Sequence, residues 1–178
     1  IISRSSKKKI RLSEINRLSK LLKKQIILDL KKIKLKKKNF ANLNFSKIPN
    51  VMGVLNLTPD SFSDGGRFNT KNKGQKHALE MFESGANIID VGGESTRPGS
   101  KSVDKNLEWK RIEKILRSIS KKIPISLDTR KSEIMKKGIN CGVKIINDVS
   151  GLSYDSETIN ILKKYKIPFV IQHSKGLP

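Results

Sequence analysis

Short apolar runs alternate with longer amphipathic stretches from residue 51 onward. The runs are rich in Val, Ile and Leu, as is typical of strands buried on both faces of a parallel sheet. They predict strands at 51–55, 87–91, 124–128, 143–147 and 168–172. The stretches between them predict helices at about 72–84, 104–120, 132–140 and 156–165. This order predicts an α/β fold whose parallel strands are joined by right-handed crossovers.

The segment before these runs has a different pattern. Apolar residues recur there at helical spacing with lysines between them, which predicts one or two short amphipathic helices; they are Ile15, Leu18, Leu22, Ile26 and Leu30. Residues 1–48 carry 16 basic and two acidic side chains, a net charge of +14, whereas residues 49–178 carry +8. We therefore place a boundary at Pro49, between a basic, Lys-rich helical extension (1–48) and an α/β domain (49–178).

The charge leaves several functions open for residues 1–48. A basic amphipathic helix can bind nucleic acid or an anionic membrane. A salt titration of binding to arbitrary duplex DNA would test whether the segment binds nucleic acid. The segment has no aromatic residue before Phe40, so it lacks a surface on which bases could stack. Lysine outnumbers arginine along the whole chain, which favours a flanking role over nucleic-acid binding.

Composition excludes some classes of protein. The chain has 178 residues and a net charge of +22. No apolar stretch approaches the ~18 residues of a membrane span. The single cysteine, Cys141, excludes a disulfide scaffold and predicts a reducing, cytoplasmic location; we interpret it as a core residue.

Polar residues follow each predicted strand. They are Asn56, the segment 94–97, Asp128, the pair Asn147 and Asp148, and His173. Any one of them could be a simple turn or cap residue. In parallel α/β folds, however, ligands bind at the C-terminal ends of the strands, and here all five ends are polar. No G-x-G-x-x-G or P-loop motif is present, which argues against the commonest nucleotide-binding folds.

Two loops carry the most specific signal. Residues 56–66 read NLTPDSFSDGG, and residues 92–99 read GGESTRPG. Glycines let backbone N–H groups approach an anion, and an arginine can clamp it. Both loops resemble those of the dihydropteroate synthase family, and the strand ends at Asp128 and Asn147 match that family in order and spacing. The resemblance covers about residues 49–178.

The resemblance implies a TIM (β/α)8 barrel, of which this chain would contain about the first five βα units. It implies a transferase of folate biosynthesis, which condenses 7,8-dihydropterin-6-ylmethyl diphosphate with 4-aminobenzoate to give 7,8-dihydropteroate and diphosphate. It also implies Mg²⁺ as cofactor and a homodimer at full length. A barrel typically needs about 200 residues or more, so we expect the chain to be a fragment, inactive and poorly folded alone.

The resemblance also assigns roles to individual residues. Asp128 would stabilise the cationic pterin and Asn147 would bind the pterin edge, while Asn56 would supply an oxygen ligand to Mg²⁺. Thr96 and Arg97 would position 4-aminobenzoate and the diphosphate. Ser61 and Phe62 would help to close that pocket.

Some features stay open at this point. Glu94 could be catalytic or could form a salt bridge at the strand ends, and His173 could orient the rim rather than touch substrate. Gln172 and Ser174 stand where the family usually has Met, so the sequence departs from the family's pattern at the expected wall of the pterin pocket. The alternatives are another pterin-binding barrel, such as a methyltetrahydrofolate-dependent methyltransferase, or a nucleic-acid-binding protein.

Overall fold

The computed structural model describes residues 9–35, 39–41, 43–45, 49–58, 73–95 and 100–172. The chain divides into two compact units, Ile1–Lys38 and Asn39–Pro178. The boundary at Pro49, inferred from composition, stays a prediction. None of the described helices is both long and apolar enough to cross a membrane.

The first unit contains a 3₁₀ helix, η1 (Leu12–Arg17), and one α-helix, α1 (Lys20–Lys34). The two helices are separated by Leu18 and Ser19, whose backbone is extended. Ile15 of η1 is buried, but no residue of α1 is. Three apolar side chains at or next to α1 are more than half exposed, namely Leu21, Ile33 and Leu35. This helix therefore owes little stability to apolar burial.

The second unit is a parallel α/β structure. Its elements are β1 (Met52–Asn56), α2 (Lys73–Glu83), β2 (Ile88–Gly92), α3 (Lys105–Ile119), β3 (Ile125–Asp128), α4 (Ser132–Asn140), β4 (Ile145–Asp148), α5 (Thr158–Tyr165) and β5 (Phe169–Ile171). The strands pair in sequence order, all parallel. The α/β class, the five strands and the four helices between them predicted from the sequence are confirmed, with element bounds that differ by only a residue or two at most ends.

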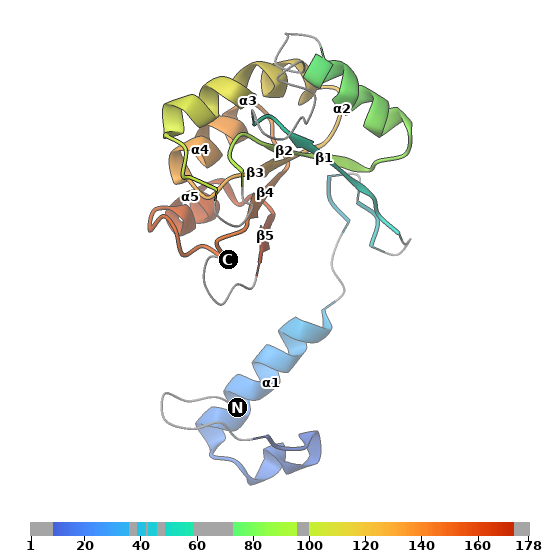
Figure 1. The fold of residues 1–178 in the computed structure, drawn as a ribbon. Coiled ribbons are helices and arrows are strands. Elements are labelled where there is room, and N and C mark those ends of the chain that lie inside the picture. The colour runs from blue at the N-terminus through green and yellow to red at the C-terminus, as the bar shows by residue number, and fades with distance from the viewer. Residues whose placement is uncertain are drawn as a thin grey trace. The chain divides into compact units, whose positions relative to one another are not determined.

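The hydrophobic core lies between the sheet and its helices, which Figure 1 shows along one side of the sheet. The strands contribute Leu55, Ile89, Val91, Ile125, Leu127 and Ile146, and the helices contribute Ala78, Ile112, Leu116, Ile119, Ile134 and Met135. Helix α4 lies so close to β3 that a Cβ on Gly138 would overlap a Leu127 methyl group. A larger residue at position 138 would therefore push α4 away from the sheet.

The central and outer strands differ in burial. All five residues of β2 are buried, whereas the three residues of β5 are all exposed. Among the described residues, β1 and β5 each pair with one neighbour only, and both carry exposed apolar side chains such as Val54 and Ile171. The strand ends at Asp128 and Asn147 thus stand on the best-packed part of the sheet, β2 to β4, whereas Asn56 ends the outer strand β1.

Candidate active site at the strand ends

The register of the sheet brings polar residues of four strands to one face. Asn56 pairs with Gly92, Gly92 with Asp128, and Asp128 with Asn147. Side chains alternate between faces along a strand, so Leu55, Val91 and Leu127 face the helices while these polar residues face the other way. We call Asn56, Asp90, Asp128 and Asn147 the polar-face cluster.

Gly92 lies between two members of this cluster. A Cβ at position 92 would come within 3.3 Å of Asp128 Oδ2 and 3.4 Å of Asn56 Oδ1. Any side chain at this position would therefore crowd the two oxygens. Glycine leaves room there for a ligand to approach both groups.

Asp128 is the most perturbed acid of the cluster. Its Oδ1 atom is buried and has no hydrogen-bond partner among the described residues. Burial raises the pKa of Asp128 to about 7, and the charges of Asp90, Glu108, Asp148 and Glu94 add to the shift. A half-buried carboxylate with one buried, unpartnered oxygen and a raised pKa is a typical functional group, because a cationic or hydrogen-bond-donating ligand would complete its contacts.

Asn147 and Asp90 are linked directly. Asn147 Nδ2 donates to Asp90 Oδ2 at 3.0 Å, while Asp90 Oδ1 is buried without a partner among the described residues. Burial raises the pKa of Asp90, against the opposing effect of the nearby Ser126 hydroxyl and the Asn147 amide. Sequence reasoning missed Asp90, although a lone aspartate within the apolar run 88–91 was a usable signal.

Asp148 follows Asn147 in the chain but has a structural role. It is fully buried on the helix side and accepts three hydrogen bonds, from Ser150 N (2.8 Å), Ser150 Oγ (2.6 Å) and Leu152 N (3.2 Å). These bonds hold a turn in which Leu152 has a φ of 68°, an uncommon conformation for a non-glycine residue. Asp148 is therefore a structural residue of the β4–α5 loop.

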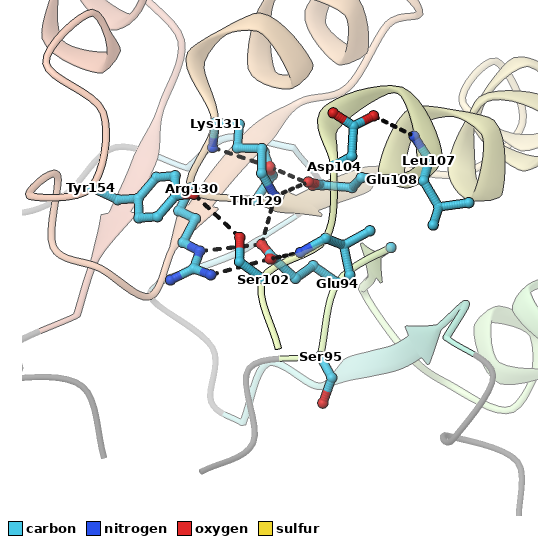
Figure 2. A network of polar contacts seen from close by, with 12 residues as sticks. Glu94, Ser95, Ser102, Asp104, Leu107, Glu108, Thr129, Arg130, Lys131 and Tyr154 are labelled. Carbon is cyan, nitrogen blue, oxygen red and sulfur yellow. Dashed lines mark hydrogen bonds and ion pairs between the residues drawn. The ribbon is translucent and has the colours of Figure 1, made fainter. Parts of the chain in front are cut away.

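Glu94 belongs to an ion network rather than to the polar-face cluster (Figure 2). Its carboxylate accepts from Arg130 Nη2 at 3.1 Å, from Arg130 Nε at 3.2 Å and from Lys131 Nζ at 2.8 Å. Lys131 Nζ also donates to Glu108 Oε2 at 2.6 Å, and Thr129 Oγ1 donates to Glu108 Oε1 at 2.6 Å. We call these five residues the Glu94 network. Of the two roles open for Glu94, the salt bridge is confirmed.

The Glu94 network also closes a loop. The Glu94 carboxylate accepts from Val103 N at 2.8 Å, so it joins the two ends of the segment between residues 94 and 103. Burial alone would raise the pKa of Glu94, but the hydrogen bonds from Arg130, Lys131 and Val103 hold it at about 2. Arg130 in turn lies over the Tyr154 ring, 4.1 Å from its centroid. Glu108 and Lys131 were not found from sequence, although a charged residue on the apolar face of α3 was a signal.

Other residues singled out from the sequence are packing groups or lie outside the described ranges. Cys141, predicted as a core residue, packs partly buried against the hydrophobic core, and Trp109 does the same. The candidate residues outside the described ranges are Ser61, Phe62, Thr96, Arg97, His173 and Ser174. Their assigned roles stay predictions.

Asn56 suits the magnesium role in its chemistry. Its amide oxygen is a hard donor, and Mg²⁺ often takes one or two protein oxygens and completes its shell with water and substrate phosphates. Gly92 leaves space beside that oxygen. No group of three or more His, Cys, Asp or Glu side chains in the described ranges could hold a metal by itself. Magnesium at Asn56 stays a prediction.

Comparison with known proteins decides the family. A family model described as pterin binding enzyme matches residues 52–178. The chain belongs to this pterin-binding family. Its match includes every strand of the sheet and the whole polar-face cluster, whereas the basic extension lies outside it.

The curated relatives of this chain include several dihydropteroate synthases. A dihydropteroate synthase of Bacillus subtilis is 40% identical over 135 residues, which are 75% of this chain and 47% of that protein. The chain thus spans about half the length of the curated relatives it matches. The resemblance to dihydropteroate synthases inferred from the two loops is confirmed.

Solved structures agree with the fold. A dihydropteroate synthase from Clostridium difficile, solved in the presence of pteroic acid, is 38% identical with a TM-score of 0.69, over 79% of this chain and 52% of that one. One from Anaplasma phagocytophilum with bound 6-hydroxymethylpterin monophosphate is 36% identical with a TM-score of 0.64, over 72% and 50%. The five-stranded sheet therefore matches part of a TIM-barrel enzyme.

Proposed function

We propose that the protein to which this chain belongs is a dihydropteroate synthase. It would join 7,8-dihydropterin-6-ylmethyl diphosphate to 4-aminobenzoate. The observation that carries the proposal is Asp128, a half-buried carboxylate whose Oδ1 is buried with no partner among the described residues, at the end of β3 and beside Asn147. The family match and the names of the relatives support the reaction class.

The reaction breaks the bond between the pterin methylene carbon and the diphosphate oxygen. The bonding electrons leave with the diphosphate, so positive charge develops on the pterin methylene group. The aniline nitrogen of 4-aminobenzoate then bonds to that carbon and loses a proton to solvent. The aniline is neutral at pH 7, so positioning contributes more than proton abstraction before attack.

Asp128 suits the charge that develops in this reaction. An ionised carboxylate in a site of low dielectric attracts a cationic ring far more strongly than it would in water. Occupation of the site by such a ring favours the charged form of Asp128, so binding would lower its pKa from about 7. Asn147, with a donor and an acceptor, would bind the edge of the pterin ring.

The diphosphate and 4-aminobenzoate would be held by the loops. Thr96 and Arg97 would position both, and Ser61 and Phe62 would close the pocket, as the family resemblance implies. Mg²⁺ held by Asn56 would supply positive charge beside the diphosphate. A cytoplasmic location and a homodimer at full length are further expectations of this proposal.

The test uses the protein expressed from its complete reading frame. Diphosphate release is measured with the dihydropterin diphosphate alone, with 4-aminobenzoate alone, and with both. We expect release only with both substrates, dihydropteroate as the product, and sulfonamides that compete with 4-aminobenzoate. Steady-state release that is independent of 4-aminobenzoate would contradict the proposal.

A further inference from the structure

Asp90 stands where an aspartate is costly. It lies in the middle of β2, a strand whose five residues are all buried, and its own exposure is 6%. Burial of a charged side chain is unfavourable unless it is paired or hydrogen-bonded. In the part of the chain that the structure describes, no Lys, Arg or His forms an ion pair with it. The fold alone gives no reason for a carboxylate at this position.

The side chain of Asp90 is hydrogen-bonded to a residue of the proposed pterin site. Asp90 Oδ2 accepts from Asn147 Nδ2 at 3.0 Å, across the face of the sheet that carries the polar-face cluster. An ionised carboxylate can only accept hydrogen bonds, so the NH₂ end of the Asn147 amide must face Asp90. The opposite end of the amide, Oδ1, is then turned away from Asp90.

This orientation matters because Asn147 pairs in register with Asp128. With Nδ2 held by Asp90, the ends of β3 and β4 present two oxygens side by side, one from Asp128 and one from Asn147. If the Asn147 amide were flipped, it would present a donor beside the Asp128 carboxylate instead. A pterin edge rich in N–H groups is complementary only to the first arrangement.

We propose that Asp90 is a positioning residue of the pterin site, which fixes the orientation of the Asn147 amide and so sets the pattern of acceptors that the ends of β3 and β4 offer to the ring. Asp90 acts through Asn147 and does not itself bind the pterin. The inference rests on the proposed function, since it takes the pterin as the ligand of Asn147.

The test is a double-mutant cycle in the protein from its complete reading frame. The probe is 6-hydroxymethylpterin monophosphate, and its dissociation constant is measured by calorimetry. Asp90→Asn keeps the size of the side chain but no longer dictates the amide orientation, so we expect about tenfold weaker binding of the probe. In the Asn147→Ala background, the same change should have no further effect. The KM for 4-aminobenzoate should change less than about twofold.

Asp155→Asn is the matched control. Asp155 accepts from Ser132 N at 2.9 Å, near the start of α4, and from Glu157 N at 2.9 Å, and neither bond involves the polar-face cluster. This change should lower the melting temperature and leave the dissociation constant of the probe as it is. If Asp90→Asn does not fold, Asp90→Ser carries the same cycle with a smaller polar group.

Three outcomes would overturn the role of Asp90. The first is an unchanged dissociation constant of the probe in Asp90→Asn. The second is a loss of probe affinity on Asp90→Asn that is equally large with Asn147 and with Ala at position 147. The third is a rise in the KM for 4-aminobenzoate as large as the rise in the dissociation constant of the probe. The proposed function fails differently. A wild-type protein that binds the probe but releases no diphosphate with both substrates would contradict the synthase reaction, while the cycle would still decide the role of Asp90. A wild-type protein that does not bind the probe would overturn both.

Discussion

The two faces of the central sheet differ in how their side chains are satisfied. On the helix side, Ile89, Val91 and Leu127 are fully buried in a continuous apolar core. On the other side, one residue further along the same strands, Asp90 and Asp128 each keep a buried oxygen with no partner among the described residues. Apolar burial therefore stabilises one face, while the other face carries polar groups that the described fold does not satisfy.

This difference follows from the alternation of side chains along a strand. Each of β2 and β3 places successive residues on opposite faces, so a single short strand can contribute both to the core and to a binding site. Polar groups that await a ligand destabilise the empty protein, and the core on the opposite face must offset that cost. The comparison predicts that substitutions on the two faces separate stability from activity.

The largest effect on stability is expected from Lys131→Met. Lys131 joins Glu94 and Glu108, and Glu108 is completely buried, so the change leaves buried carboxylates without their shared cation. Loss of one partner of a buried ion pair typically costs about 3–5 kcal/mol. Chemical denaturation of the protein from its complete reading frame should show a loss of this size.

Lys137→Met is the control for that change. Lys137 lies in α4, the helix that begins directly after Lys131, and contacts Glu133 at 2.9 Å, but its side chain is 34% exposed. An exposed ion pair contributes at most about 1 kcal/mol. Equal effects of the two substitutions would show that the Glu94 network does not stabilise the fold.

Asp128 and Asp148 end adjacent strands but lie on opposite faces of the sheet, so substitutions at these positions compare the two faces directly. Asp128→Asn removes a charge from the polar face, so we expect turnover to fall about 10²–10³-fold with stability unchanged or higher. Asp148→Asn weakens a carboxylate that accepts three hydrogen bonds on the helix side. That change should cost about 1–3 kcal/mol of stability and reduce turnover far less.

Turnover and melting temperature of both variants, each compared with wild type, provide the readout. Glu94→Gln extends the series, because Glu94 belongs to the ion network rather than to the polar-face cluster. Its turnover, measured on the folded fraction, should fall much less than that of Asp128→Asn. Small and equal losses of turnover in Asp128→Asn and Glu94→Gln would contradict the role of Asp128.

A smaller effect is expected from pH. As pH rises toward about 7, the ionisation of Asp128 should lower the stability of the folded protein and raise its activity. The pKa of Asp128 is raised from 3.8 to about 7 in the folded state, mainly by burial. Between these values the folded protein holds a proton that the unfolded chain has lost, so this group makes stability fall as pH rises from about 4 to about 7. Over the acid limb below about pH 7, kcat/KM for the pterin substrate should rise up to tenfold per pH unit as Asp128 ionises.

Asp128→Asn supplies the reference for both curves. It should lack the acid limb in kcat/KM and should gain stability relative to wild type as pH rises through the same interval. Glu94 does not interfere, since its pKa of about 2 keeps it ionised throughout. A wild-type acid limb centred near pH 4 would contradict the assignment of the raised pKa to Asp128.

Much of the fold was predictable from the sequence because its signals are local. The apolar runs of β2, β3 and β4 and the turn-forming residues between them indicate a βα order without knowledge of any contact. The two loop motifs indicated the family, and Asp128 and Asn147 were found because they end strands.

Residues that depend on distant partners could not be assigned in the same way. Lys131 and Glu108 are 23 positions apart, and Asn147 and Asp90 are 57 apart, so only the register of the sheet and the packing of α3 bring them together. Asp148 illustrates the converse case. It follows Asn147 and is the last residue of β4, but the alternation of side chains turns it toward the helices and into a structural role.

The most direct test of the account is whether the polar face of the sheet binds a pterin through Asp128. Calorimetric titration of the protein from its complete reading frame with 6-hydroxymethylpterin monophosphate at pH 8 compares wild type, Asp128→Asn and Asp148→Asn. The account predicts saturable binding by wild type, a loss of at least about tenfold in Asp128→Asn, and nearly unchanged affinity in folded Asp148→Asn. Equal affinity of wild type and Asp128→Asn would contradict it.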